Sequence, residues 1–263
     1  MSGKVKTAEM SWKEVEEKIA SGAAAIVPMG STEEHGPHSP TGDYLITDAI
    51  AEQVAANSGA VVTPSIAFSY SEYFRHYPGT ITVQGPTLRL LVRDVVGCLL
   101  DQGFKHVILF NGHKGNDPIL SPLVREIRRE RGVIVPIVSP LAFGLTPSVK
   151  QELFGDEKTG HGGEPIGSIM TYLHPEWMRM DLAGEYGTSE FLGKRPDGLS
   201  GIVFDGTPVG MAINMGDITP PTGSLSDPNG AKAERGERIV TNAVARLTDF
   251  VNWFATVDPM VAP

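Results

Sequence analysis

The 263-residue sequence contains a single cysteine, Cys98, so it cannot form a disulfide within one chain. It has no run of about 18 apolar residues, the length that a membrane-spanning helix needs. It also lacks an excess of basic residues, because 31 acidic residues outnumber 22 basic ones and the formal net charge is −9. These absences argue against a disulfide scaffold, a membrane-spanning protein and a protein whose main partner is nucleic acid.

The first twenty residues have no apolar signal core and read as a charged helix, so we expect a cytoplasmic protein. Apolar residues make up 41% of the chain, which is ordinary for a globular protein able to bury a large core. We expect one domain over residues 1–263, with a Gly/Pro-rich excursion at about 184–230. Because long structureless loops are uncommon in compact domains, this excursion is expected to form a lid or an oligomer interface rather than a disordered insert.

Strand and helix patterns alternate along the rest of the chain. Short apolar runs predict strands at residues 23–28, 60–68, 106–110 and 133–138. Apolar residues at three- and four-residue spacing predict helices at residues 47–57, 87–102, 117–131, 165–173 and 231–255. Such alternation favours an α/β fold with a parallel sheet that helices cover on both faces.

The most informative segment is residues 30–43, GSTEEHGPHSPTGD, which follows the first predicted strand. It gathers carboxylates and imidazoles, which divalent transition metals prefer where no thiolate is available. Glu33 and His35 are two residues apart, so in an extended segment both side chains project to the same side. Asp43 can approach the same point, and Asp48 is the nearby alternative. The segment therefore predicts a metal-dependent enzyme rather than a binding module.

Most of the histidines follow predicted strands. His35 and His38 come after the first strand, and His76, His113 and His161 come after the second, third and fourth strands. Ligands of a parallel α/β sheet bind at the carboxyl ends of its strands. We therefore expect these imidazoles to meet at one edge of the sheet.

The other candidates lie in the segments NGHKGN and HGGE. His113 is predicted as a metal ligand. Glu164 stands at the predicted start of a helix, where the helix dipole favours an ionised carboxylate; its alternative is a helix N-terminal carboxylate without a ligand role. The predicted substrate-binding residues are His38, His76, Lys114 and Asn116. Structural alternatives also exist, since His38 could orient a ligand, His76 could pack beside Tyr77, and Lys114 could be a surface lysine.

Four blocks, GSTEEHGPHSPTGD, HYPGT, NGHKGN and HGGE, resemble in order and spacing the signature blocks of the creatininase (creatinine amidohydrolase) family. The resemblance implies a three-layer α/β/α sandwich with a mainly parallel sheet, usually assembled as a homohexamer. It implies one or two divalent ions per chain, zinc first and manganese or iron otherwise. It also implies a catalytic role for His161, with metal ligands at Glu33, His35, Asp43, His113 and a further glutamate.

The sequence departs from this family pattern around the last ligand and the substrate. The final glutamate ligand of creatininase corresponds to Gly115, and we infer that Glu164 replaces it as a ligand and catalytic residue. The tryptophans that hold and cover creatinine correspond to Leu141 and Glu157. The family's glutamine before the first signature histidine is Glu34 here. We therefore expect a substrate other than creatinine.

The leading hypothesis is hydrolysis of a small polar, cyclic substrate by metal-activated water, with ring opening of the amidohydrolase type. His161 would protonate the leaving group, because an imidazole is poised near neutral pH. The alternative is hydrolytic C–C ring opening of an oxidised cyclitol, such as 3-dehydro-scyllo-inosose or a diketo-inositol. Formamide deformylation, peptide cleavage and a non-catalytic metal-binding scaffold rank below these. The expected partners are a small-molecule substrate and further copies of the chain.

Overall fold

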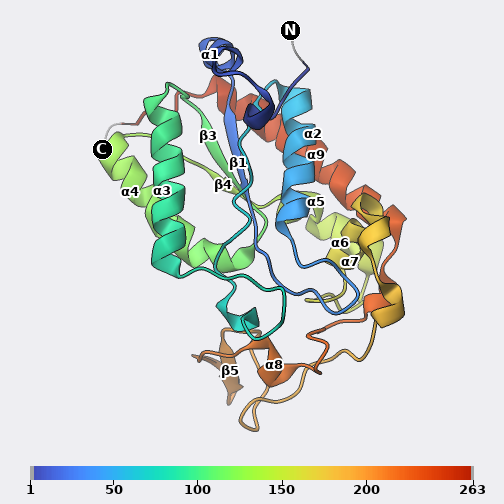
Figure 1. Ribbon diagram of the computed structural model, residues 1–263. Helices are drawn as coiled ribbons and strands as arrows, with labels where there is room; N and C mark the ends of the chain where they lie inside the picture. Colours follow the sequence, from blue (N-terminus) through green and yellow to red (C-terminus); the bar gives the residue numbers. More distant parts are fainter. Residues whose placement is uncertain (1–2, 262–263) are drawn as a thin grey trace.

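The computed structural model of the protein describes residues 3–261 and contains a four-stranded parallel sheet in the order β2–β1–β3–β4 (Figure 1). The strands are β1 (Ala25–Met29), β2 (Val61–Val62), β3 (Val107–Asn111) and β4 (Ile137–Val138). β1 and β3 pair over their whole length, from Ala25 opposite Val107 to Met29 opposite Asn111. All residues of these two strands are buried, which explains why both read as continuous apolar runs.

All four predicted strands are present, but β2 and β4 are shorter than the sequence pattern suggests. The chain continues through Pro64 after β2, and Pro136 precedes β4. Proline has no N–H to donate, so each of these residues can contribute only its carbonyl oxygen to the ladder, as Pro136 does toward the Leu109 N–H at 2.9 Å.

Helices cover both faces of the sheet (Figure 1). The long helices are α2 (Tyr44–Ser58), α3 (Gly85–Asp101), α4 (Asp117–Arg131) and α9 (Ala233–Thr256). The shorter ones are α1 (Trp12–Ala20), α5 (Pro140–Gly144), α6 (Pro147–Phe154), α7 (Ile166–Leu173) and α8 (Met215–Ile218). No helix within residues 3–261 is both long and apolar enough to cross a membrane.

The alternation of side chains along the strands divides the interior into two cores. Ile26 and Ile108 belong to a cluster with residues of α2, α7 and α9. Val27 and Leu109, the next residues along each strand, belong to a second cluster with residues of α3 and α4. Because successive strand residues point to opposite faces, each face of the sheet acquires its own helical layer. The expected three-layer α/β/α arrangement is confirmed.

The Gly/Pro-rich excursion contains ordered elements. β5 (Gly201–Phe204) and β6 (Thr207–Gly210) form an antiparallel hairpin, and α8 follows it. Ile202, Ile213 and Ile218 bury one another in a small core of their own. In Figure 1 this part lies at the end of the molecule opposite the two chain termini. The single domain expected over residues 1–263 stays a prediction.

The contact of α7 with α9 gives a stability test. Gly236 is buried on α9, where an added Cβ would collide with the backbone carbonyl oxygen of Ser168 on α7. We expect Gly236→Ala to lower the free energy of unfolding by about 1–3 kcal/mol through overpacking, although alanine favours helices by roughly 1 kcal/mol.

Gly97→Ala is the matched control, because the nearest atom to its added Cβ on α3 is Arg131 Nη2 at 3.7 Å. This control should leave stability unchanged or raise it by up to about 1 kcal/mol. Denaturant unfolding of both variants provides the comparison. Equal stabilisation by the two substitutions would show that α7 and α9 are not in such close contact.

Candidate active site and metal centre

The site lies where the order of the strands reverses. β2 lies on one side of β1, β4 lies on the other side of β3, and the loops that leave β1 and β3 therefore diverge. Such a reversal leaves a crevice at the carboxyl ends of the strands. The loop after β1 carries Glu33, His35 and Asp43, and the loop after β3 carries His113. All four side chains are buried.

Two groups of side chains have ligand atoms within 4.8 Å of one another and could each hold a metal ion. One group is Glu33, His35 and His161, and the other is Glu33, Asp43 and His113. The carboxylate of Glu33 belongs to both: its Oε1 lies 3.7 Å from His35 Nε2, and its Oε2 lies 3.2 Å from His113 Nδ1. These residues could therefore hold one or two ions, and Glu33 is the member that the two groups share.

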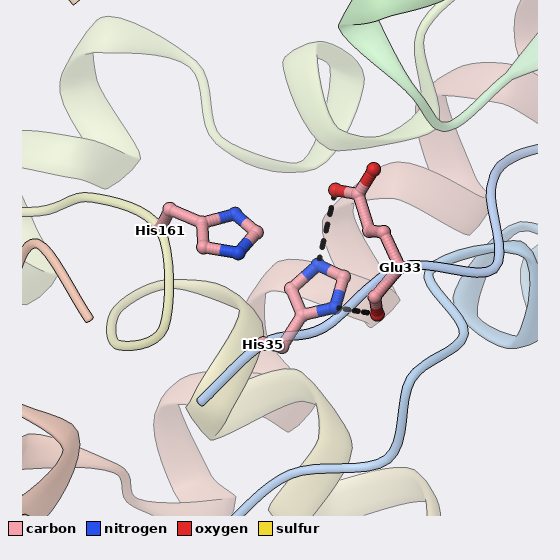
Figure 2. A group of neighbouring side chains, drawn as sticks. All are labelled: Glu33, His35 and His161. Atoms are coloured by element: carbon pink, nitrogen blue, oxygen red, sulfur yellow. Dashed lines mark hydrogen bonds and ion pairs between the residues drawn. The ribbon is translucent and has the colours of Figure 1, made fainter. Parts of the chain in front are cut away.

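Further polar contacts orient the candidate metal-ligand atoms of His35 and Asp43. His35 Nδ1 lies 3.1 Å from the backbone carbonyl oxygen of Glu33, which directs Nε2 toward the Glu33 carboxylate (Figure 2). Asp43 Oδ1 accepts a hydrogen bond from the backbone N–H of Ser31, and Oδ2 lies 3.2 Å from His113 Nδ1. Partners of this kind fix the orientation of imidazole and carboxylate ligands before an ion binds.

The buried carboxylates of the site favour the binding of a cation. Glu33 and Asp43 bring two buried carboxylates to one imidazole. Burial opposes a charge on His113, but Glu33 and Asp43 outweigh this effect and raise the pKa of His113 to about 9. The imidazole of the metal-free site therefore takes up a proton that a divalent cation would replace. The oxygen and nitrogen donors fit zinc, manganese or iron.

His161 is held as a rigid neighbour of this centre. Its ring stacks on His35 with centroids 4.7 Å apart and on Phe74 with centroids 4.4 Å apart. Its Nε2 lies 2.7 Å from the backbone carbonyl oxygen of Glu34 and 3.0 Å from Glu34 Oε1. Burial opposes a charge on this ring, but Glu34 outweighs it and raises the pKa of His161. Figure 2 shows the ring directed toward the space between Glu33 and His35.

A cavity of about 970 Å³ opens onto the two groups. Its lining includes Glu33, His35, Asp43, His113 and His161, together with Lys114 and Glu164. One wall comes from the excursion, through the turn at residues 197–200 and through Met215 and Leu225. The strand ends thus supply the reactive groups, and the excursion supplies part of the surface that a substrate meets.

Glu164 lies in the cavity wall but outside both candidate metal groups. Its Oε1 accepts hydrogen bonds from Ser168 Oγ at 2.6 Å and from Arg235 Nη1 at 3.1 Å. Its Oε2 is buried with no partner among residues 3–261. Burial raises the pKa of Glu164, although Ser168 and Arg235 act in the opposite direction. Its role as a ligand and catalytic residue stays a prediction.

The predicted substrate-binding residues occupy different surroundings. Lys114 is exposed and lines the cavity. His76 is exposed beside Tyr77, with ring centroids 4.3 Å apart, and is not part of the cavity lining. His38 is buried, and neither of its ring nitrogens has a partner among the described residues. Asn116 is buried and bonds to Asn111 and to the backbone N–H of Tyr70, so it supports the walls around His113.

Two further residues of the site, Ser71 and Tyr73, were not predicted from the sequence. Ser71 donates a hydrogen bond to Glu33 Oε2 at 2.8 Å, and the Tyr73 hydroxyl lies 3.3 Å from His113 Nε2. Both belong to the segment SYSEYF, just before HYPGT and after the second predicted strand. The rule that located the histidines, polar residues after strand ends, would have found them had it been applied to hydroxyl groups as well.

The comparison with protein families matches the creatininase family, described as creatinine amidohydrolase, over residues 8–251. A creatinine amidohydrolase of Pseudomonas putida is 30% identical over 95% of this chain and 97% of its own length. A 3-dehydro-scyllo-inosose hydrolase of Thermotoga maritima is 36% identical over 40% of this chain and 34% of its own length. A mycofactocin precursor peptide peptidase of Mycolicibacterium smegmatis is 28% identical over 85% of this chain and 82% of its own length.

Solved structures agree over nearly the whole chain. A crystal structure of creatinine amidohydrolase has a TM-score of 0.81 and 26% identity, covering 97% of this chain and 100% of its own. A manganese form of creatininase has a TM-score of 0.80 and 27% identity, with 96% and 99% covered. A mutant creatininase of Zn–Zn type has a TM-score of 0.79 and 27% identity, with 97% and 100% covered.

Fold, site and comparisons together define an α/β metal-dependent hydrolase with a divalent metal cofactor. Within this class the chain belongs to the creatininase family.

The shared position of Glu33 leads to a prediction about metal content. We expect protein purified without added metal to carry one or two equivalents of zinc, manganese or iron per chain. Glu33→Gln should weaken metal binding by more than about tenfold, because it removes a charged donor from both groups. Elemental analysis after desalting measures the content.

Glu72→Gln is the control, because Glu72 is a carboxylate outside both candidate metal groups that pairs with Arg75. Its metal content should equal that of the unmodified protein. Full metal content in Glu33→Gln would show that Glu33 is not a ligand.

Proposed function

We propose that the protein hydrolyses a C–N bond of a small, polar, cyclic amide other than creatinine, and so opens the ring. The observation that carries this proposal is the position of His161, which shares the cavity and one candidate metal group with Glu33 and His35. A divalent ion held by these ligands would supply an activated water and polarise the attacked carbonyl group.

Proton transfer to the leaving nitrogen is assigned to His161. Both groups next to its Nε2 are acceptors, the backbone carbonyl oxygen and the carboxylate of Glu34, so Nε2 carries a proton that it donates to them. Nδ1 has no hydrogen-bond partner among residues 3–261 and, unlike the ring nitrogens of His38, is not an enclosed buried atom. Nδ1 is therefore the nitrogen that passes a proton to the departing amine.

The cavity lining supports a substrate other than creatinine. No tryptophan of the described residues lines it, and Leu141 stands at one of the positions where the family resemblance places a creatinine-covering tryptophan. At the other such position, Glu157 pairs with Arg235. The lining thus lacks the two tryptophans that would hold and cover creatinine, although Tyr70, Tyr73 and Phe74 line other parts of the cavity.

A second candidate function is hydrolytic C–C ring opening of an oxidised cyclitol. It is favoured by the polar groups of the lining, including Lys114, Asp197, Ser200 and Thr159, which can bond to several hydroxyl groups at once. The similarity to an inosose hydrolase over part of the chain is consistent with this reading.

A substrate panel separates the candidates. The metal-loaded protein is incubated with lactams and cyclic ureides, creatinine, keto-inositols, formamides and a short peptide, and ring-opened or cleaved products are detected by mass spectrometry. Turnover of a lactam or ureide supports the proposal, whereas turnover of a keto-inositol alone favours the second candidate. Absence of any turnover with full metal content would favour a non-catalytic metal-binding scaffold.

The assigned role of His161 is testable once a substrate is found. We expect His161→Asn to lower kcat by about 10²–10⁴-fold, because it removes the general acid. An ion at Glu33, Asp43 and His113, the candidate group without His161, should stay bound. His174→Asn is the control, since His174 stacks on Trp177 and does not line the cavity. Equal kcat for His161→Asn and the unmodified enzyme, both fully metal-loaded, would remove His161 from the mechanism.

We also propose that the chain assembles as a homohexamer, as the family resemblance implies. Exposed apolar side chains such as Leu192, Phe204 and Trp177 leave apolar surface available for contacts between copies. Light scattering should give about six times the 28.2 kDa mass of the chain. A monomeric mass would contradict this assembly. The cytoplasmic location expected from the sequence stays a prediction.

A further inference from the structure

Tyr73 brings a hydroxyl group to His113 from the loop after β2. It lies in a short 3-10 turn (Glu72–Phe74) and lines the cavity. Its ring meets Tyr70 and Phe74 edge-on, with ring centroids 6.2 Å and 4.9 Å away. These contacts hold the ring so that its hydroxyl oxygen lies 3.3 Å from His113 Nε2.

The Tyr73 hydroxyl stands where a side chain at position 115 would have to begin. A Cβ added to Gly115 would collide with the Tyr73 hydroxyl oxygen and with His113 Nε2. Position 115 is also where the family resemblance places a glutamate ligand. In this chain a neutral hydroxyl from a different loop therefore occupies the space next to the site of the missing carboxylate.

The hydrogen of the Tyr73 hydroxyl has no acceptor in the part of the chain that the structure describes. His113 Nδ1 faces the carboxylates of Glu33 and Asp43 at 3.2 Å, so Nδ1 is the nitrogen available to an ion. A ligating imidazole then keeps its proton on Nε2, which lies 2.9 Å from the backbone carbonyl oxygen of Tyr70. The Tyr73 oxygen can only accept a hydrogen bond from such an N–H group. Its own hydrogen has no acceptor among residues 3–261.

The Tyr73 hydroxyl is a donor by its ordinary chemistry, because a phenol carries its hydrogen near neutral pH. Since Tyr73 lines the cavity, this hydrogen is available to a substrate that enters it.

We propose that Tyr73 is a catalytic residue whose hydroxyl donates a hydrogen bond to the oxygen of the attacked carbonyl group as negative charge develops on it. This inference rests on the proposed hydrolysis and restricts the substrates to compounds attacked at a carbonyl group. A donor held in the cavity wall that bonds to this oxygen as the charge develops stabilises the transition state more than the ground state. Tyr73 thereby contributes to the rate of the reaction, whereas Glu33, Asp43 and His113 hold the ion.

Tyr73→Phe tests the donor, because it removes one oxygen and keeps the ring that packs on Phe74. We expect kcat to fall by about 10²–10³-fold, as for other lost oxyanion donors, with little change in KM and full metal content. Tyr77→Phe is the matched control: its hydroxyl contacts Thr219 Oγ1 outside the cavity lining, and kcat should not change. Unchanged kcat in Tyr73→Phe would overturn the proposal. Loss of metal from this variant would overturn it too, because Tyr73 would then only position His113.

A binding measurement decides the question if no substrate is found. Calorimetry compares the binding of acetohydroxamate, a small metal-binding oxygen ligand, to zinc-loaded unmodified protein and to Tyr73→Phe. Loss of one hydrogen bond to a charged oxygen should weaken binding by about tenfold. Weaker binding without turnover of the panel would refute the proposed hydrolysis and still support Tyr73 as a donor. Equal binding without turnover would refute both.

Discussion

The whole site depends on the parallel pairing of β1 with β3. These two strands are hydrogen-bonded over their full length and end together at Met29 and Asn111. The backbone N–H of Gly112 donates to the carbonyl oxygen of Met29 at 2.8 Å, so the register extends to the first residue beyond β3. Because strand order reverses here, the two loops open a crevice at a fixed separation. A slip of one residue would turn every side chain of a strand to the other face.

The second constraint is electrostatic. Glu33 and Asp43 are buried within reach of one imidazole, an arrangement that is costly without a compensating positive charge. Without a metal, the two carboxylates raise the pKa of His113 and so favour a positive charge on its ring, and a bound divalent ion would supply that positive charge instead. A glutamate at position 115 would add a third negative charge at this point. The neutral hydroxyl of Tyr73, which stands there instead, leaves the charge of a divalent ion matched by two carboxylates.

Sequence patterns predicted those features that short stretches of chain determine. Continuous apolar runs located β1 and β3, and the spacing of apolar residues located α3, α4 and α9. The convergence of Glu33, His35, Asp43 and His113 followed from the rule that parallel strands share a carboxyl edge.

Features that depend on partners distant in sequence could not be predicted in the same way. Glu164 meets Arg235, which lies 71 residues further along the chain on α9, and only the packing of α9 on α7 brings them together. The contact of Tyr73 with His113 has the same character, because it joins loops 40 residues apart. A sequence shows which residues can ligate or donate, but the choice among partners is made by tertiary packing.

The cavity wall contributed by the excursion has an evolutionary consequence. The candidate metal ligands Glu33, Asp43 and His113 lie on loops anchored to β1 and β3, whereas the turn at residues 197–200 leads into a hairpin that packs in its own small core. Insertions, deletions or exchanges in that hairpin can therefore reshape what enters the cavity while the ligand geometry stays intact. Changes in this surface segment can therefore alter which compounds bind. The metal ligands on the sheet, and with them the type of reaction, can stay the same.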